Sequence, residues 1–474
     1  KRIVAHAVPR SSIRNGVAMS THSSSGVAAT ADGPDEYPDW LTLDNSAKIW
    51  PALLSPRHST MFRLTACLVE PIRLARLQSA LSDIMGRFPY FDVELRRGLF
   101  WYYIESHRAT ETAVEADSVN PCMNAALIGK GHLPLRVRAF NTRISVEFSH
   151  MITDGTGALT FLRALVTRYC ELSGTSCSPL EGLPRMGEVV DPREWEDSYP
   201  AAIVASTSGL PRIPPPETAF RMPSALLPTG TYRVISGLLP ASEVVALAKQ
   251  QGVSLTEYVA AVLLYCLQDI QERRLTTHGR WGHLKPIRLT VPVNLRPMFD
   301  SRTMRNFFLF VDPGIDPRLG RYTFEEIADQ VHHHMRFNLQ KKRMRLMITR
   351  NVRGEQSILN RLMPAFVKDA VLQVVFHFLG DRRYSLGLSN LGRVQLPPEL
   401  NGAFSHWVFT PPPSPVSKVN CAVLSWQDTL CVTFGSMARG TELEQEFFRF
   451  FSSKGLSVYV ESNAEWCERE TVGS

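Results

Sequence analysis

His150, Asp154 and Gly155 stand together in the stretch SHMITDGTGA, residues 149–158. A histidine acts as a general base near neutral pH without a large shift of its pKa. An aspartate four residues later is suited to cap a following helix or to pair with an arginine elsewhere in the chain. A glycine lets the backbone turn sharply and leaves space beside an imidazole. The spacing therefore predicts a catalytic turn with His150 as the base, and this chemistry needs no metal.

The sequence around the motif predicts a strand before it and a helix after it. Residues 133–140 and 143–150 alternate apolar and polar side chains on either side of a short turn, which is typical of a β-hairpin. Every second residue of the second strand then shares one inward face, and His150 continues that face. Apolar residues recur at helical spacing over 158–169. We therefore expect the motif at a strand-to-helix junction.

The length of 474 residues and the hydrophobic content of 44% favour two domains over one. Residues 1–36 are rich in Ser, Ala, Thr and Gly without periodic hydrophobes, so we expect a disordered leader. An N-terminal domain is expected over 37–172 and a C-terminal domain over 229–474. Between them, residues 173–228 are rich in Gly, Pro and Ser and predict a crossover.

Strand and helix patterns are mixed in both halves, which predicts an α/β fold of layered α+β sandwiches. In the first half we expect a helix over 72–85 and paired strands at 91–95 and 100–104. The second half has a capping box, Ser254 to Glu257, at the start of a helix, and Gly252 ends the helix before it. In the second half we expect further strands at 231–239, 287–293, 384–390, 418–426 and 430–437. We expect helices there at 242–251, 258–270, 325–340 and 442–455.

Composition excludes several classes of protein. The excess of 52 Lys and Arg over 45 Asp and Glu gives a net charge of +7, which helps to attract an anionic ligand, yet the chain has no long basic block of the kind that binds nucleic acid. No apolar run is long enough to span a bilayer, and the first residues lack the apolar core of a secretory signal. The eight cysteines are scattered, as in reduced proteins. We expect a soluble, cytoplasmic protein, and a monomer.

SHMITDGTGA resembles the H-x-x-x-D-G motif of the CoA-dependent acyltransferase superfamily, which includes chloramphenicol acetyltransferase, carnitine acyltransferases, plant BAHD acyltransferases and peptide-synthetase condensation domains. LDNSAKIWPALLSPRHSTMFRLTACL, GRFPYFDVELRRGLFWYYIE, VPVNLRPMFDSRTMRNFFLFVDPGID and LSNLGRVQLP resemble its alcohol acetyltransferase branch, in the same order and over most of residues 38–460. The resemblance implies two chloramphenicol-acetyltransferase-like domains with an active-site tunnel at their interface. It also implies acyl-CoA, most simply acetyl-CoA, as a cosubstrate rather than a permanently bound cofactor.

By the same resemblance, His150 would deprotonate an acceptor alcohol, or less readily an amine, which then attacks the thioester directly. Arg296, just after a predicted strand, resembles the arginine that pairs with the motif aspartate, and a surface arginine is the alternative. Ser389 and Asn390 are candidate donors near the thioester or the pantetheine arm, and a plain turn role is the alternative. Ser149 stands where condensation domains usually carry a first histidine, and the D-F-G-W-G motif of plant BAHD enzymes is absent.

Other sites and functions compete with this interpretation. His332, His333 and His334 suggest a metal, but adjacent helical residues point about 100° apart, so a solvated or half-buried helix face fits better. The basic run KKRMR, residues 341–345, is either a solvated helix face or a surface for cofactor phosphates. A transferase that takes its acyl group from an acyl carrier protein, and forms a polyketide or peptide product, is the alternative on the same fold. A non-catalytic binding module is the alternative of another class.

Overall fold

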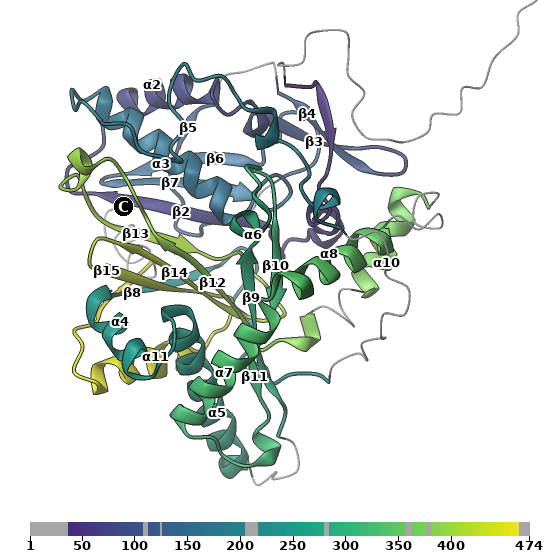
Figure 1. Cartoon of the computed structure of the whole chain (residues 1–474), viewed down its shortest axis with the longest axis vertical. Helices are drawn as coiled ribbons and strands as arrows, with labels where there is room; N and C mark the ends of the chain where they lie inside the picture. Colours follow the sequence, from purple (N-terminus) through teal and green to yellow (C-terminus); the bar gives the residue numbers. More distant parts are fainter. Residues whose placement is uncertain are drawn as a thin grey trace, which may run out of the picture.

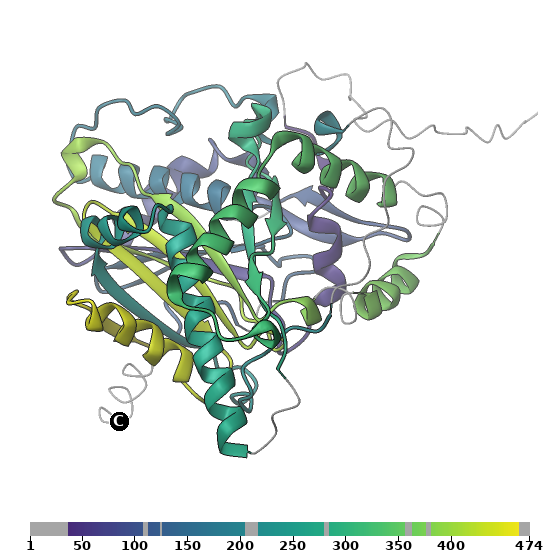
Figure 2. The same cartoon turned by 60° about the horizontal axis from the view of Figure 1, so that its bottom comes forward.

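The computed structural model describes residues 37–107, 112–123, 126–203, 217–278, 284–355, 363–375 and 381–463. The leader expected over residues 1–36 lies outside the described residues. Two large β-sheets lie next to each other, and helices cover the outer side of each, as expected for a layered α/β fold (Figure 1). A view from another side shows the same arrangement (Figure 2).

The first large sheet has the strand order β13-β2-β7-β6-β5. Its strands from the first half are β2 (Met61–Leu68), β5 (Val114–Ala116), β6 (Leu135–Phe140) and β7 (Arg143–Ser149). The antiparallel pair β6 and β7 confirms the predicted hairpin. Helix α2 (Leu74–Met85) packs against helix α3 (Gly155–Glu171), which contacts β2 and β7. Both helices confirm the helical spacing in the sequence.

A small sheet lies beside the first one and has the order β1-β4-β3. Its strands are β1 (Trp40–Thr42), β3 (Val93–Arg97) and β4 (Tyr102–Ser106). β3 and β4 pair as an antiparallel hairpin, which confirms the second hairpin that we expected. The short helix α1 (Trp50–Leu53) follows β1 and contacts helix α10 (Ala365–Val375) of the second half.

The second large sheet has the order β10-β9-β12-β14-β15-β8-β16, and β11 also pairs with β9. Its strands are β8 (Arg233–Pro240), β9 (Ile287–Asn294), β10 (Phe308–Val311), β11 (Gly314–Ile315), β12 (Leu386–Arg393), β14 (Val419–Trp426), β15 (Thr429–Ser436) and β16 (Tyr459–Ser462). β12 pairs in parallel with β9 and β14, whereas the other pairs are antiparallel. Every strand predicted in the second half is present, so the alternation of apolar residues was a reliable signal.

Helices cover the outer side of the second sheet. They are α4 (Ala241–Gln250), α5 (Leu255–His278), α7 (Phe324–Asn338) and α11 (Glu442–Ser453). The short helix α6 (Arg296–Phe299) and helix α8 (Lys341–Glu355) lie nearer the first half (Figure 1). The capping box of α5 is formed as predicted, because the Ser254 N–H donates to Glu257 at 2.7 Å and the Glu257 N–H donates to the Ser254 hydroxyl at 3.4 Å. Gly252 follows α4 with a φ of 70°, which favours glycine.

One strand of the second half belongs to the first sheet. β13 (Phe404–Thr410) pairs antiparallel with β2 and lies beside β14 and β15. The sequence analysis does not predict this strand. The range 229–474 that we expected to fold as a C-terminal domain therefore contributes an edge strand to the sheet of the other half.

The parts of the crossover that the structure describes pack against both halves. In residues 173–203 and 217–228 the only helical elements are short 3-10 turns, in keeping with the Gly, Pro and Ser content of these segments. Trp195 nevertheless packs in the core of the first half, and Tyr199 packs in the core of the second. Arg87 donates two 2.8 Å hydrogen bonds to the Glu194 carboxylate, so this part of the crossover is tied to the first half by a buried ion pair.

Candidate active site

The motif lies at the strand-to-helix junction predicted for it. β7 ends at Ser149, Asp154 is the N-cap residue of α3, and α3 begins at Gly155. The His150 N–H donates to the carbonyl of Thr60 at 3.0 Å, and the hydroxyls of Ser149 and Thr60 are 2.8 Å apart. These bonds extend the pairing of β7 with β2 beyond the last paired residues. They fix the backbone that carries the imidazole.

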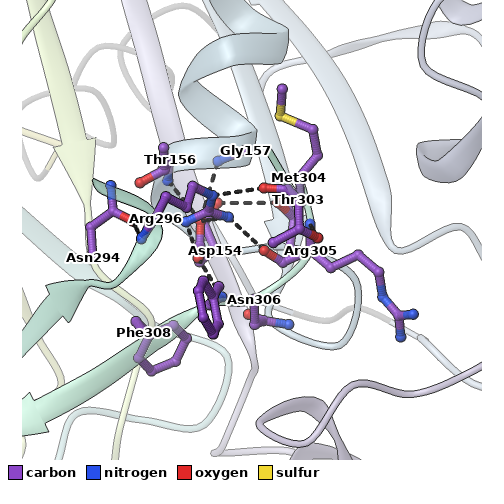
Figure 3. Close-up of polar contacts among 12 residues, drawn as sticks. Asp154, Thr156, Gly157, Asn294, Arg296, Thr303, Met304, Arg305, Asn306 and Phe308 are labelled. Carbon is purple, nitrogen blue, oxygen red and sulfur yellow. Dashed lines mark hydrogen bonds and ion pairs between the residues drawn. The ribbon is translucent and has the colours of Figure 1, made fainter. Parts of the chain in front are cut away.

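The Asp154 carboxylate anchors the turn (Figure 3). Oδ1 accepts from the backbone N–H groups of Thr156 at 3.0 Å and Gly157 at 3.2 Å, which caps α3. Arg296 donates to both oxygens, at 2.9 and 3.1 Å, and the Phe307 N–H donates to Oδ2 at 3.0 Å. A carboxylate offers about four lone-pair sites, so these donors saturate it. Asp154 is therefore held as an anchor and has no lone pair left for a proton relay.

Arg296 forms the ion pair with Asp154 that the family resemblance implies, and only 10% of its side chain is exposed, which rules out a surface arginine. Its Nε donates to the carbonyl of Thr303 at 2.7 Å. Nη1 donates to Asn294 at 3.2 Å and Nη2 donates to the carbonyl of Arg305 at 2.6 Å, in addition to their bonds to Asp154. All five N–H groups of the guanidinium thus have an acceptor. A lysine offers three donors from one point and cannot reproduce this set.

The segment 303–307 holds the motif from the other side, and the sequence analysis did not identify it. The Thr153 hydroxyl donates to the Met304 carbonyl, and the Asn306 side-chain amide donates to the His150 carbonyl at 2.9 Å. Together with the Phe307 bond, these contacts join residues that are separated by 151 to 156 positions in the sequence. The segment lies within a stretch that resembles the acyltransferases, but no periodic pattern indicates that it folds against the motif.

Aromatic rings surround the His150 imidazole. Trp50 stacks on it with ring centroids 5.4 Å apart and an angle of 21°, and the rings of Phe62 and Phe308 lie at 4.5 and 6.2 Å. This burial lowers the pKa of His150 to about 4, so the imidazole is neutral at physiological pH. Nδ1 is buried and makes no hydrogen bond of full geometry, although the Asn306 side chain and the Thr153 backbone lie close enough to oppose the lowering of the pKa. The residue as a whole is half-buried, and Nε2 is not among the buried polar atoms that lack a partner, so Nε2 is the ring nitrogen left to meet a substrate.

A buried carboxylate, Asp44, supports the amide that touches the His150 backbone. The Asn306 amide donates to Asp44 at 2.9 Å, and Asp44 also accepts from the Ala47 N–H at 2.8 Å. Burial raises the pKa of Asp44 to about 6, against the opposing effect of Arg305, whose Nε lies 3.8 Å away. The Asn306 amide oxygen is itself buried without a partner. Sequence analysis missed both residues, although Asp44 belongs to the stretch LDNSAK that resembles the acyltransferases.

The glycines of the motif act through packing rather than through backbone freedom. We expected Gly155 to allow a sharp turn, but it is the first residue of α3 and does not have a positive φ. A Cβ at Gly155 would lie 2.7 Å from a methyl group of Leu391, so the space beside it is filled by β12. A Cβ at Gly157 would lie 2.3 Å from the carbonyl oxygen of Met304 and 2.2 Å from the Thr153 hydroxyl. Gly157, which the sequence analysis did not single out, is therefore the stricter requirement.

Ser389 and Asn390 lie on β12, next to the residue that packs on Gly155. The Asn390 amide donates to the Thr256 hydroxyl at 2.8 Å and accepts from the Gly392 N–H at 2.8 Å. These contacts favour the turn role for Asn390, because its amide nitrogen is occupied at the start of α5 and its amide oxygen by Gly392 of β12 itself. Ser389 pairs with Ala422 of β14. A role for either residue beside a thioester stays a prediction.

The rival sites do not assemble. His332, His333 and His334 lie near three different carboxylates, those of Glu257, Asp329 and Asp312. Among the described residues, no group of three or more His, Cys, Asp or Glu is placed to hold a metal ion. No single helix in the described ranges is long and apolar enough to cross a membrane, although the bent pair α4 and α5 passes that test jointly. The seven cysteines that the structure describes are free, and six are buried.

The run KKRMR begins α8 and lies against aromatic rings. The Lys341 ammonium lies 5.4 Å from the centre of the Phe299 ring, and the Arg345 guanidinium lies 5.7 Å from the same ring. The Arg343 guanidinium lies 3.9 Å above the ring of Phe337. These contacts favour the helix-face interpretation of the run over a surface for phosphates.

No protein-family model matches the chain, and no curated protein matches it. Solved structures share its fold. The trichothecene 15-O-acetyltransferase TRI3 from Fusarium sporotrichioides matches with a TM-score of 0.55 and 12% identity, over 86% of this chain and 93% of that one. The condensation domain from the Monacolin K polyketide synthase MokA matches with a TM-score of 0.53 and 11% identity, over 87% of this chain and 96% of that one. Polyketide synthase associated protein 5 from Mycobacterium tuberculosis matches with a TM-score of 0.51 and 12% identity, over 86% of this chain and 96% of that one.

Identities this low establish the fold and leave the reaction open. The fold agrees with the one that the sequence resemblance implies. This chain has the mixed α/β fold of condensation domains and of an acetyltransferase.

Proposed function

We propose that the chain is an acyltransferase that moves an acyl group, most simply acetyl, from acyl-CoA to the hydroxyl of a small molecule. The observation that carries this proposal is the position of the His150 imidazole, which is stacked on Trp50 and packed against Phe62 with Nδ1 buried; the burial also lowers its pKa and keeps the ring neutral. A base must be unprotonated and held in place before the acceptor arrives. Asp154, Arg296 and the segment 303–307 supply that rigidity.

The proposed reaction has one covalent exchange and no acyl-enzyme. His150 Nε2 takes the proton of the acceptor hydroxyl as its oxygen forms a bond to the thioester carbonyl carbon. The carbonyl oxygen becomes an oxyanion in the tetrahedral intermediate. As that intermediate collapses, the carbon–sulfur bond breaks, CoA leaves as a thiolate, and the proton on His150 passes to the sulfur. The products are an ester and free CoA.

Asn306 is proposed to set the tautomer of the base. Its amide oxygen and His150 Nδ1 are both buried without a partner, and the two residues are already joined through the His150 carbonyl. A small adjustment in the substrate complex would let Nδ1–H donate to that oxygen, which leaves the lone pair on Nε2. Asp44 holds the amide nitrogen of Asn306 and so fixes which end of the amide faces the imidazole.

A second candidate takes its acyl group from an acyl carrier protein. The favouring observation is that solved structures with this fold include a condensation domain and a polyketide synthase associated protein. Against it, Ser149 occupies the position of the first histidine of condensation domains, and its hydroxyl contacts Thr60 in a structural role. We therefore place CoA before a carrier protein as the donor.

Free-thiol release tests the proposal. Wild type is incubated with acetyl-CoA or longer acyl-CoAs, or with an acylated carrier protein, together with pooled alcohols and amines. His150→Ala is compared with His333→Ala, a matched histidine that is exposed on α7. We expect acceptor-dependent release that falls about 10²-fold or more in His150→Ala alone, since general-base assistance contributes at least that much.

Other outcomes distinguish the alternatives. Release with the carrier protein and none with any acyl-CoA would favour the second candidate. Equal release by His150→Ala and wild type would remove His150 from the mechanism. Tight binding of acyl-CoA without any turnover would favour a non-catalytic binding module on this fold.

A further inference from the structure

A cavity of about 340 Å³ is lined in part by residues that adjoin, in the chain, the segments contacting His150. Leu54 on its wall directly follows α1, whose Trp50 stacks on the His150 imidazole. Ser59, also on its wall, directly precedes Thr60, whose carbonyl accepts the His150 N–H. Consecutive Cα atoms are about 3.8 Å apart, so Ser59 brings one wall of this cavity close to the His150 backbone, and Leu54 adds a wall next to the short helix that carries Trp50. We call it the side pocket.

Most of the side pocket is apolar. The apolar residues that line it are Leu54, Pro56, Met123, Ala126, Leu127 and Ile128. Met123 also packs against Tyr232 and Met437 of the second half, so the pocket opens at the boundary between the two halves of the chain. Its volume is within the range of pockets that hold small organic ligands, roughly 300–1,000 Å³.

The polar residues of the side pocket are neutral. The Ser55 hydroxyl accepts from the His58 N–H at 3.0 Å, and the Ser59 hydroxyl accepts from the Met61 N–H at 3.1 Å. Each hydroxyl keeps its own O–H to donate to a ligand oxygen. Burial lowers the pKa of His58 to about 4, which keeps its imidazole uncharged near neutral pH. Among the described residues that line the pocket there is no Asp, Glu, Lys or Arg.

We propose that the side pocket binds the acceptor, and that the acceptor is a neutral alcohol with a bulky apolar skeleton and further oxygen atoms. This inference rests on the proposed function. The apolar wall matches the skeleton, and the Ser55 and Ser59 hydroxyls match the oxygens. A charged acceptor would lose its hydration in this pocket without gaining an opposite charge.

The same features argue against the other parts of the reaction as occupants. CoA carries phosphates, which need cations or helix N-termini for binding, and the described lining offers no cationic side chain. A long acyl chain is all hydrocarbon, so it would leave the hydroxyls of Ser55 and Ser59 without a ligand partner. An acetyl group is far smaller than the cavity. The acceptor is the one component whose chemistry matches both the apolar and the polar wall.

Filling the pocket tests the inference. Ala126 is exposed on the pocket wall, so Ala126→Phe narrows the cavity without disturbing the core. Ala75→Phe, at an exposed position on α2, is the matched control. The acceptors are butanol, cyclohexanol and decalinol, with acetyl-CoA as donor. We expect Ala126→Phe to raise KM for decalinol about tenfold or more, with butanol and acetyl-CoA changed less than about twofold. A change in acyl-chain preference instead, or no difference from Ala75→Phe, would overturn the assignment.

Charge tests the class of acceptor. Ser55→Asp keeps an acceptor for the His58 N–H and adds a carboxylate to the pocket wall. KM for the neutral alcohols should rise and KM for cyclohexylamine should fall in this variant, because the added carboxylate attracts an ammonium group. A lower KM for cyclohexylamine than for cyclohexanol in wild type would show that the pocket serves a cationic amine instead. Decalinol binding to wild type and to Ala126→Phe, measured by titration calorimetry without donor, separates this inference from the proposed function. Saturable binding that Ala126→Phe abolishes supports the pocket even if no thiol is released, whereas no binding to wild type overturns it.

Discussion

Replacing Asp154 by asparagine isolates the ion pair at the centre of the site. Asparagine is also a good N-cap, so Oδ1 can still accept from Thr156 and Gly157 and the cap is retained. The variant removes the negative charge and turns an –NH2 group toward donors, which leaves Arg296 buried and unpaired, with 10% of its side chain exposed. Removing one partner of a buried ion pair costs about 3–5 kcal/mol of the free energy of unfolding.

A matched surface pair provides the control. Asp316 caps a 3-10 turn and is paired with Arg318 at 2.6 Å, but 44% of the Arg318 side chain is exposed. Asp316→Asn should therefore cost less than about 1 kcal/mol. The free energy of unfolding is measured by urea denaturation of both variants and wild type. If Asp154→Asn loses no more stability than Asp316→Asn, the reasoning about a buried anchor is refuted.

Three further predictions concern the same site. Because burial lowers the pKa of His150 from its ordinary 6.5 to about 4, the base stays neutral in the free enzyme, and kcat/KM should be level from pH ~5 to ~8 and fall toward pH 4. An inflection near 6.5 in the rate profile would contradict the burial. The unfolded chain takes up the proton first, so His150 also makes stability fall as pH drops from 6.5 toward 4. Gly157→Ala should cost about 1–3 kcal/mol or more in urea denaturation, because its Cβ meets the Met304 backbone, whereas Gly155→Ala meets a Leu391 methyl group that can rotate and should cost less. Asn306→Ala removes the amide that donates to the His150 carbonyl and should lower kcat/KM about tenfold, with the acid limb of the rate profile left near pH ~4. An unchanged kcat/KM would remove Asn306 from the positioning of the base.

Local pattern was enough to predict most elements. The hairpin of β6 and β7 and the helix α3 follow from periods of two and 3.6, and together they place His150 and Asp154 at one turn. The pairing of Arg296 with Asp154 came from resemblance, since nothing in the spacing of two residues 142 positions apart indicates contact. These predictions succeeded because each depends on neighbours in sequence or on a motif that recurs in other chains.

The remaining features depend on contacts that local pattern does not encode. β13 has no turn or partner nearby in sequence, because its partner β2 lies more than 300 residues earlier. Asn306 and Asp44 are polar residues in irregular segments, and only the folded chain brings them together. The role of Gly157 is steric and becomes visible when the Met304 carbonyl is in place. Sequence analysis therefore located the base and its anchor but not the groups that orient them.

The exchange of β13 has a consequence for synthesis on the ribosome. All eight residues of β2 are buried, and β2 lies between β7 and β13 in the sheet. Until residues 404–410 have been translated and have emerged, one edge of β2 has no partner, and an open strand edge with apolar neighbours favours association with other chains. The nascent first half must therefore remain incomplete for most of translation. A fragment that stops before residue 404 should collect in the insoluble fraction, even though it contains His150 and Asp154.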